Sequence, residues 1–88
     1  MKHRHLNPER AARRLSAFAH PLRMNILRSV AENHHRSVSD IAHHLHQSQP
    51  QISHHVAILE RADILRTRAD GRKRCPIFIT PEMKTFFL

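Results

Sequence analysis

Residues 48–65 read SQPQISHHVAILERADIL, and the organisation of this segment decides the fold. Ser48 and Gln51 have the spacing of a capping box, in which two side chains bond the free backbone N–H groups at the start of a helix. Apolar side chains then recur at helical spacing, at Ile52, Val56 and Leu59. We therefore predict a helix over residues 48–62 with one buried face.

A second, shorter helix is predicted immediately before it. Ser37 is followed three residues later by Asp40, an acidic variant of the capping box. The apolar stripe that follows is Val38, Ile41, Ala42 and Leu45. This helix is expected to end near His46, and a turn of about three residues, roughly His46 to Ser48, joins it to the next helix. Two short helices joined in this way form a helix-turn-helix, although the usual turn glycine is missing.

Beyond residue 62 the hydrophobic period changes from helical to two, which indicates strands over residues 64–69 and 74–80. Asp70 and Gly71 lie between them, and an Asp-Gly pair favours a tight hairpin turn because such turns need positive φ. The second strand is expected to direct one side inward, with Cys75, Ile77 and Ile79. The sequence therefore predicts a β-hairpin directly after the helix-turn-helix.

Two further helices are predicted upstream. Asn7 is a suitable N-cap, with Pro8 at the first helical position. His20 and Pro21 interrupt the run and start a second helix over residues 21–32, since proline ends one helix and suits the first turn of the next. The expected buried face of the first run is Ala11, Leu15, Phe18 and Leu22.

A last short helix is predicted over residues 81–88. Residues 1–6 are expected to form a flexible basic arm, and residues 7–88 a single domain, because chains divide into domains only at much greater length. The predicted fold class is mainly α with a small β-hairpin, a winged helix-turn-helix in the order α-α-α-α-β-β-α.

The charge balance suggests the partner. Among 88 residues, 15 Lys and Arg face 7 Asp and Glu, for a net charge of +8, and twelve of the fifteen are Arg. A small, strongly basic chain has the electrostatic properties of a nucleic-acid binder, although a solvated basic surface is the plainer alternative. No apolar run approaches the about 18 residues that span a bilayer, and no secretory signal is visible, so we expect a cytoplasmic protein that does not enter membranes.

The sequence resembles the winged-helix repressors of the ArsR/SmtB type over about residues 10–82. The matching stretches are AHPLRMNIL (19–27), SVSDIAHHL (37–45), SQPQISHHVAILERADIL (48–65) and GRKRCPIFIT (71–80). The resemblance implies a homodimeric, sequence-specific DNA-binding transcriptional regulator, usually a repressor released by a signal. Residues 48–62 would be its recognition helix, and two-fold pairing would match a palindromic operator on double-stranded DNA with half-sites roughly 34 Å apart.

The candidate DNA-binding residues form two groups. On the recognition helix they are Ser48, Gln49, Gln51, Ser53, His54 and Arg61. On the hairpin they are Arg66, Arg68, Arg72, Lys73 and Arg74. Gln pairs well with adenine edges, and Arg suits phosphates and narrow minor grooves. The alternatives are that Gln51 only caps its helix and that the hairpin is a charged surface; His55 is expected to turn back toward the core.

Dimerisation is expected to use apolar residues near both ends of the chain. The candidates are Leu6, Leu15, Phe18, Met83, Phe86, Phe87 and Leu88. A domain this small has little core in which to bury all of them. The alternative is that the aromatic rings cover the core of their own monomer.

Ten histidines invite a metal interpretation, and Asp40, His43 and His44 have a spacing that could hold zinc with one further ligand. However, residues 37–40 read SVSD where the resembling thiolate sensors have CVCD, and hydroxyls are poor ligands for soft metals. The lone Cys75 is expected to be a buried apolar residue. We therefore predict neither a metal nor another cofactor.

Protonation is a further hypothesis for control, because His titrates near pH 6.5 and protonated His54 and His55 would strengthen phosphate binding. No catalytic constellation is evident, so an enzyme is not predicted. Two alternative functions stay open: a winged-helix protein-interaction module and a non-specific architectural DNA binder. The operator, the regulated genes and the effector are not encoded in any recognisable motif.

Overall fold

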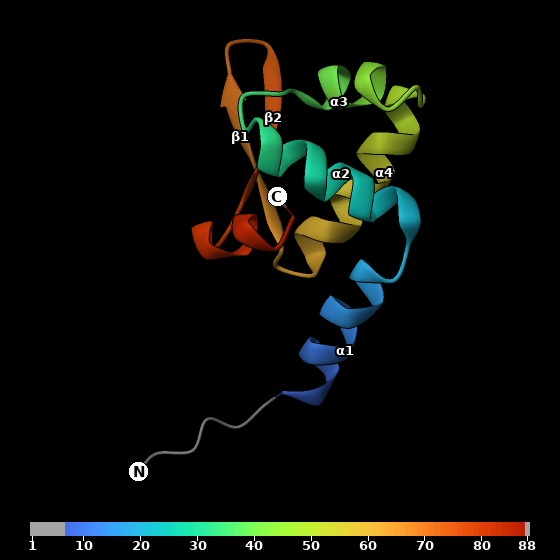
Figure 1. Cartoon of the computed structure of the whole chain (residues 1–88), viewed down its shortest axis with the longest axis vertical. Coiled ribbons are helices and arrows are strands. Elements are labelled where there is room, and N and C mark those ends of the chain that lie inside the picture. Colours follow the sequence, from blue (N-terminus) through green and yellow to red (C-terminus); the bar gives the residue numbers. More distant parts are fainter. Residues whose placement is uncertain (1–6, 88) are drawn as a thin grey trace.

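The computed structural model describes residues 7–87, which form four α-helices, a two-stranded antiparallel hairpin and a short 3₁₀ helix (Figure 1). In chain order these are α1 (Pro8–Phe18), α2 (Pro21–Glu32), α3 (Val38–His44), α4 (Gln49–Arg61), β1 (Leu65–Asp70), β2 (Lys73–Phe78) and η1 (Pro81–Phe87). This order confirms the predicted winged helix-turn-helix. The proposed basic arm at 1–6 and the apolar Leu6 and Leu88 lie outside the described residues.

Each α-helix begins at a side chain that accepts a hydrogen bond from the first turn. The Oγ atoms of Ser37 and Ser48 accept from the backbone N–H groups of the residues three positions later, at 3.0 Å and 3.2 Å. At α3 the box is complete, because Asp40 Oδ2 also accepts from the Ser37 N–H at 2.9 Å. At α4 only the Ser48 half forms. Within residues 7–87, the Gln51 side chain therefore has no hydrogen-bond partner and is available to an external ligand.

The turn of the helix-turn-helix forms without glycine because His46 adopts the left-handed conformation, with φ of 56°. The N–H of Gln47 donates to the carbonyl of Ala42 at 2.9 Å, which closes the end of α3. Asp63 plays the same part at the end of α4, with φ of 59°. The left-handed residues supply the sharp exits that glycine usually allows.

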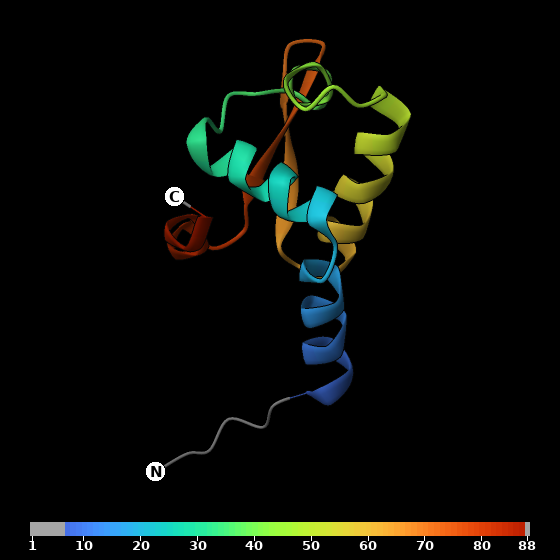
Figure 2. The same cartoon turned by 45° about the vertical axis from the view of Figure 1, so that its right-hand side comes forward.

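The core lies among α2, α3, α4 and the base of the hairpin. Its fully buried side chains are Ile26, Leu27, Val30, Ile41, Ile52, Leu59, Ile64 and Leu65. The predicted stripe of α4 is confirmed. That of α3 is confirmed at Val38, Ile41 and Ala42, whereas Leu45 is half-buried against the core. The prediction for α1 was partly wrong: Leu15 is 69% exposed, and Ala17 is the residue of this helix that is buried. The reason is that α1 extends away from the body of the domain, as Figures 1 and 2 show.

The hairpin turn lies within residues 70–73, the gap that the two predicted strands leave between them. Asp70 pairs with Lys73, so Gly71 and Arg72 form the two-residue loop. Gly71 has φ of 62° at the first of these positions, where a type II′ turn takes glycine. β2 ends at Phe78, two residues earlier than predicted, and Ile79 lies outside the strand and is exposed, contrary to prediction.

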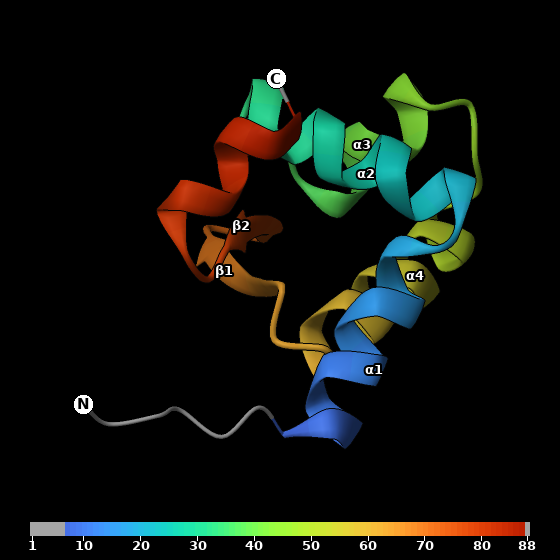
Figure 3. The ribbon, with the colours of Figure 1, turned by 60° about the horizontal axis from the view of Figure 1, so that its bottom comes forward.

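The arrangement of α1 and η1 completes the fold. Figure 3 shows α1 beside the second half of α4, and η1 beside α2. Arg10 forms an ion pair with Asp63 at 3.1 Å, and Arg14 Nε donates to the carbonyl of Ala62 at 3.3 Å. No helix in the described range 7–87 combines the length and apolar character needed to cross a membrane.

Candidate nucleic-acid interface

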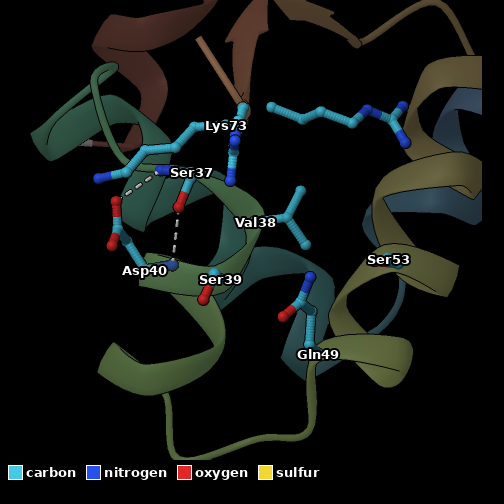
Figure 4. A pocket seen from close by; sticks show the side chains of 9 residues that line it. Ser37, Val38, Ser39, Asp40, Gln49, Ser53 and Lys73 are labelled. Carbon is cyan, nitrogen blue, oxygen red and sulfur yellow. Dashed lines mark hydrogen bonds between the residues drawn. The ribbon is translucent and has the colours of Figure 1, made fainter. Parts of the chain in front are cut away.

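Three segments that are distant in sequence surround one surface pocket of about 320 Å³ (Figure 4). They are the start of α3, the first half of α4 and the tip of the hairpin. Its lining residues are Ser37, Val38, Ser39, Asp40, Gln49, Ser53, Arg72, Lys73 and Arg74. The fold therefore places the polar start of the expected recognition helix directly opposite the basic tip of the expected wing.

The recognition helix α4 has two distinct faces. Ile52, Val56 and Leu59 are buried, which leaves the opposite face to solvent. The exposed candidates on α4 and at its N-cap are Ser48, Gln49, Gln51, Ser53, His54 and Arg61. A helix with polar side chains exposed over its first two turns can place them at base edges in the major groove.

Not every predicted DNA-binding residue belongs to the pocket. Arg61 lies at the far end of α4, beside α1, where it lines a different groove with Arg13. Arg66 pairs with Ile77 near the base of the hairpin, away from the tip. The Arg68 guanidinium lies 3.5 Å from His35 Nδ1 in the loop before α3. All three are exposed, but the structure does not bring them together with Gln49 and Arg72. The exposed Ser48, Gln51 and His54 of the α4 region do not line the pocket either.

Sequence reasoning missed Ser39 as part of this surface. It is exposed in the first turn of α3 and lines the pocket with Gln49 (Figure 4). The signal was present, because the capping box at Ser37 fixes where α3 begins. What local pattern could not show is that this turn faces the hairpin tip.

The carboxylate of Asp40, which lines the pocket, already accepts a hydrogen bond from the Ser37 N–H. The hydrogen bonds from the backbone and side chain of Ser37 hold the pKa of Asp40 below its usual value. Lys73 and Arg36 add a smaller favourable charge interaction. The acidic group is thus bound to the cap of α3, and the three basic residues of the hairpin tip dominate the electrostatics of the pocket.

The two histidines of α4 have opposite environments. His54 is exposed on the candidate DNA face, whereas His55 is only 7% exposed and faces the core side, as predicted. Arg23 Nε donates to His55 Nδ1 at 3.1 Å. Burial, and then the charges of His20, Arg23 and His54, lower the pKa of His55. The hypothesis that protonated His55 strengthens phosphate binding was therefore wrong, because this ring is inaccessible to phosphate.

Four of the candidate dimerisation residues line an open apolar pocket of about 370 Å³ together with Met24; they are Phe18, Met83, Phe86 and Phe87. The Phe87 ring stacks on Phe18 and Phe78, with centroids 6.1 Å and 5.7 Å apart. Phe86, in contrast, is 81% exposed. Part of this aromatic set thus covers its own monomer, and part is left exposed together with Leu15.

The family model described as "Bacterial regulatory protein, arsR family" matches residues 20–67, more than half of the chain. The chain belongs to the ArsR family. The matched range runs from the N-cap of α2 through the helix-turn-helix into β1. The chain is thus an ArsR-family DNA-binding transcriptional regulator, as the resemblance implied. No curated protein matches its sequence.

Solved structures share the fold of this ArsR-family chain. HlyU from Vibrio cholerae is 27% identical with a TM-score of 0.80, covering 96% of this chain and 90% of that one. NolR from Sinorhizobium fredii is also 27% identical, with a TM-score of 0.75 and coverage of 96% and 89%. A Mycobacterium bovis fragment, described as a homodimeric winged helix-turn-helix DNA-binding domain, is 21% identical with a TM-score of 0.83, covering 91% and 73%. This last likeness supports the fold alone.

In this ArsR-family chain, the segment SVSD (37–40) caps the start of α3. Ser37 and Asp40 form the capping box of α3, in which Asp40 Oδ2 accepts from the Ser37 N–H. Among residues 7–87 there is no group of three or more His, Cys, Asp or Glu side chains arranged to hold a metal ion. Cys75 is buried, and its Sγ donates to the carbonyl of His35 at 3.5 Å.

Proposed function

We propose that this ArsR-family regulator is a homodimeric repressor that reads a palindromic operator with α4 and grips the DNA backbone with the hairpin. The observation that carries the proposal is the single pocket shared by the polar start of α4 and the basic hairpin tip. A duplex seated there would present base edges to the helix and phosphates to the hairpin. Because the site holds no catalytic constellation, we propose binding and not chemistry as its activity.

The chemistry of the side chains suggests which of them contact bases and which contact phosphates. Gln49, Gln51, Ser53 and His54 are proposed to reach the major groove, with Gln as the most selective reader because its amide can pair twice with adenine. Ser48 is proposed to contact a phosphate beside the helix start. The Arg and Lys residues of the hairpin are proposed to contact phosphates, which fix register without carrying sequence information. Arg61, Arg66 and Arg68 are proposed to extend this backbone contact outside the pocket.

Dimerisation is proposed to bury the exposed apolar residues of α1 and η1, chiefly Leu15 and Phe86. α1 and η1 each bring apolar surface to solvent in one monomer. A two-fold axis through this surface would present two α4 helices to successive major grooves, roughly 34 Å apart. Leu6 and Leu88 are proposed to contribute to the same interface.

Replacing Gln51 by alanine tests the reading role. Because its side chain makes no hydrogen bond within the described chain, stability should change little. Specificity should relax at one base pair of each half-site, at a cost of about 1–3 kcal/mol. The measurement is the binding-site profile from selection on a random duplex pool. Lys84→Ala, on η1 outside the pocket, is the control and should leave the profile unchanged; an unaltered profile for Gln51→Ala would show that Gln51 does not read bases.

Replacing Phe86 by glutamate tests the dimer. A charge buried in an apolar interface without a partner costs several kcal/mol, so the variant should sediment as a monomer at micromolar concentration. Gln47→Glu introduces the same charge in the exposed turn before α4 and should stay dimeric. Sedimentation velocity distinguishes the two. If both variants remain dimers, the interface lies elsewhere on the molecule.

The alternative functions predict different binding behaviour. Fluorescence-anisotropy titration across a salt series compares the DNA upstream of the gene for this chain with a scrambled duplex. A specific repressor should prefer one duplex by about 10³-fold or more. An architectural protein would bind both equally with a steep salt dependence. A protein-interaction module would bind neither at low salt.

A further inference from the structure

A cluster of basic side chains connects the recognition helix to the start of α2. His55 lies on the inner side of α4, and Arg23 Nε donates to its Nδ1 at 3.1 Å. The same guanidinium reaches α1, because Arg23 Nη1 donates to the carbonyl of Ser16 at 3.5 Å. One arginine therefore connects three helices, and its contact with α4 depends on a histidine nitrogen that accepts.

His20 lies against this pair from the junction of α1 and α2. Its ring centroid is 4.7 Å from that of His55. His20 Nδ1 accepts from the N–H of Leu22 at 3.2 Å and so caps α2. Two neighbouring imidazoles thus use an unprotonated nitrogen in the fold. An imidazolium has two donors and no acceptor, so each bond is incompatible with the charged form of its histidine.

We propose that Arg23 and His55, with His20 against them, form an acid-sensitive lock that holds the recognition helix to the start of α2 and releases it when His55 takes up a proton. Uptake of that proton removes the acceptor and places an imidazolium 3.1 Å from a guanidinium nitrogen. The charged or titratable groups that act on His55 are His20, Arg23 and its neighbour His54, and all of them are basic. The charges of these three groups disfavour a positive charge on His55.

The direction of the pH effect follows from linkage. The pKa of His55 is lowered in the folded chain, chiefly by burial. The unfolded chain therefore binds this proton more readily than the folded chain does. The contribution of the lock to stability is fully present above the unfolded value of about 6.5 and is lost as the pH falls below it toward the folded value. Acid should loosen the first half of α4, where Gln51 and His54 lie.

The test compares urea unfolding midpoints of the DNA-free protein at pH 7.5 and pH 5.0. His55→Gln keeps an acceptor for Arg23 but cannot take up a proton. His44→Gln makes the same substitution at an exposed position on α3 and is the matched control. From pH 7.5 to pH 5.0, the urea concentration at the unfolding midpoint should fall by similar amounts in wild type and His44→Gln. In His55→Gln it should fall by less than half as much. An equal loss in His55→Gln would overturn the proposal.

An NMR titration of the wild type keeps the proposal testable if His55→Gln fails to fold. The Arg23 Nε–H signal should move in step with the signals of the His55 ring as that ring takes up its proton. A guanidinium signal that stays constant while His55 titrates would refute the lock.

The consequence for DNA rests on the proposed function of α4 and is measured separately. The ratio of operator to scrambled-DNA affinity should fall several-fold from pH 7.5 to pH 5.0 in the wild type and stay level in His55→Gln. A ratio of one in the wild type at pH 7.5 would contradict the proposed function and leave the unfolding test of the lock standing. A wild-type preference that is equal at both pH values would show that release of the lock does not reach the DNA face.

Discussion

Replacing Arg72, Lys73 and Arg74 together by alanine is expected to weaken DNA binding about 100-fold on every sequence, since each charge-assisted phosphate contact contributes about 1 kcal/mol or more. All three are exposed at the hairpin tip and line the pocket that faces α4. The logarithmic salt slope should flatten by about three, because each lost phosphate contact no longer releases a counterion. Anisotropy titration across a salt series measures both quantities.

A control of equal charge separates local contact from net charge. Arg13→Ala, Arg28→Ala and Lys84→Ala together remove three positive charges from α1, α2 and η1. If the hairpin grips the backbone, this variant should keep nearly the wild-type slope and affinity. Equal losses in the two triple variants would mean that overall charge, and not the hairpin, drives binding.

Leu59→Ala is expected to lower the free energy of unfolding by about 2–5 kcal/mol. Leu59 is fully buried on the inner face of α4, so truncation leaves a cavity between the recognition helix and the core. That is a large share of the about 5–15 kcal/mol that holds a typical domain together. Urea unfolding at one fixed protein concentration measures the loss. Ile58→Ala, at a half-buried position next to it, should cost less, and the reverse order would contradict the assignment of the inner face.

Helix starts and the fold class were readable from sequence because the signals are local. The caps at Asn7, Ser37 and Ser48 lie within three residues of the N–H groups that they satisfy. The hairpin was also predicted, but its two loop residues were not, because Asp-Gly and Gly-Arg are both compatible with a tight turn. The strand register that decides between them depends on packing against the rest of the domain. Exposure of Leu15 likewise depends on where α1 leaves the body.

The candidate site was predictable on the helix and less so across elements. The stripe of Ile52, Val56 and Leu59 fixes which face of α4 is exposed, and so identifies Gln51 and His54. Sequence pattern could not show that Ser39 and the hairpin tip share a pocket with this face. Nor could it show the contact between Arg23 and His55, which are 32 residues apart. Such contacts arise from tertiary packing, which periodicity does not encode.

Selection of bound sites from a random pool of DNA duplexes tests directly whether α4 reads an operator, because it needs no knowledge of the operator sequence. We expect enrichment of one two-fold symmetric sequence, with half-sites about one helical turn apart. In the Gln51→Ala variant the information should fall at one symmetric pair of positions, while the remainder of the motif is kept. A bound pool that shows no enriched sequence would contradict the proposal that α4 reads an operator.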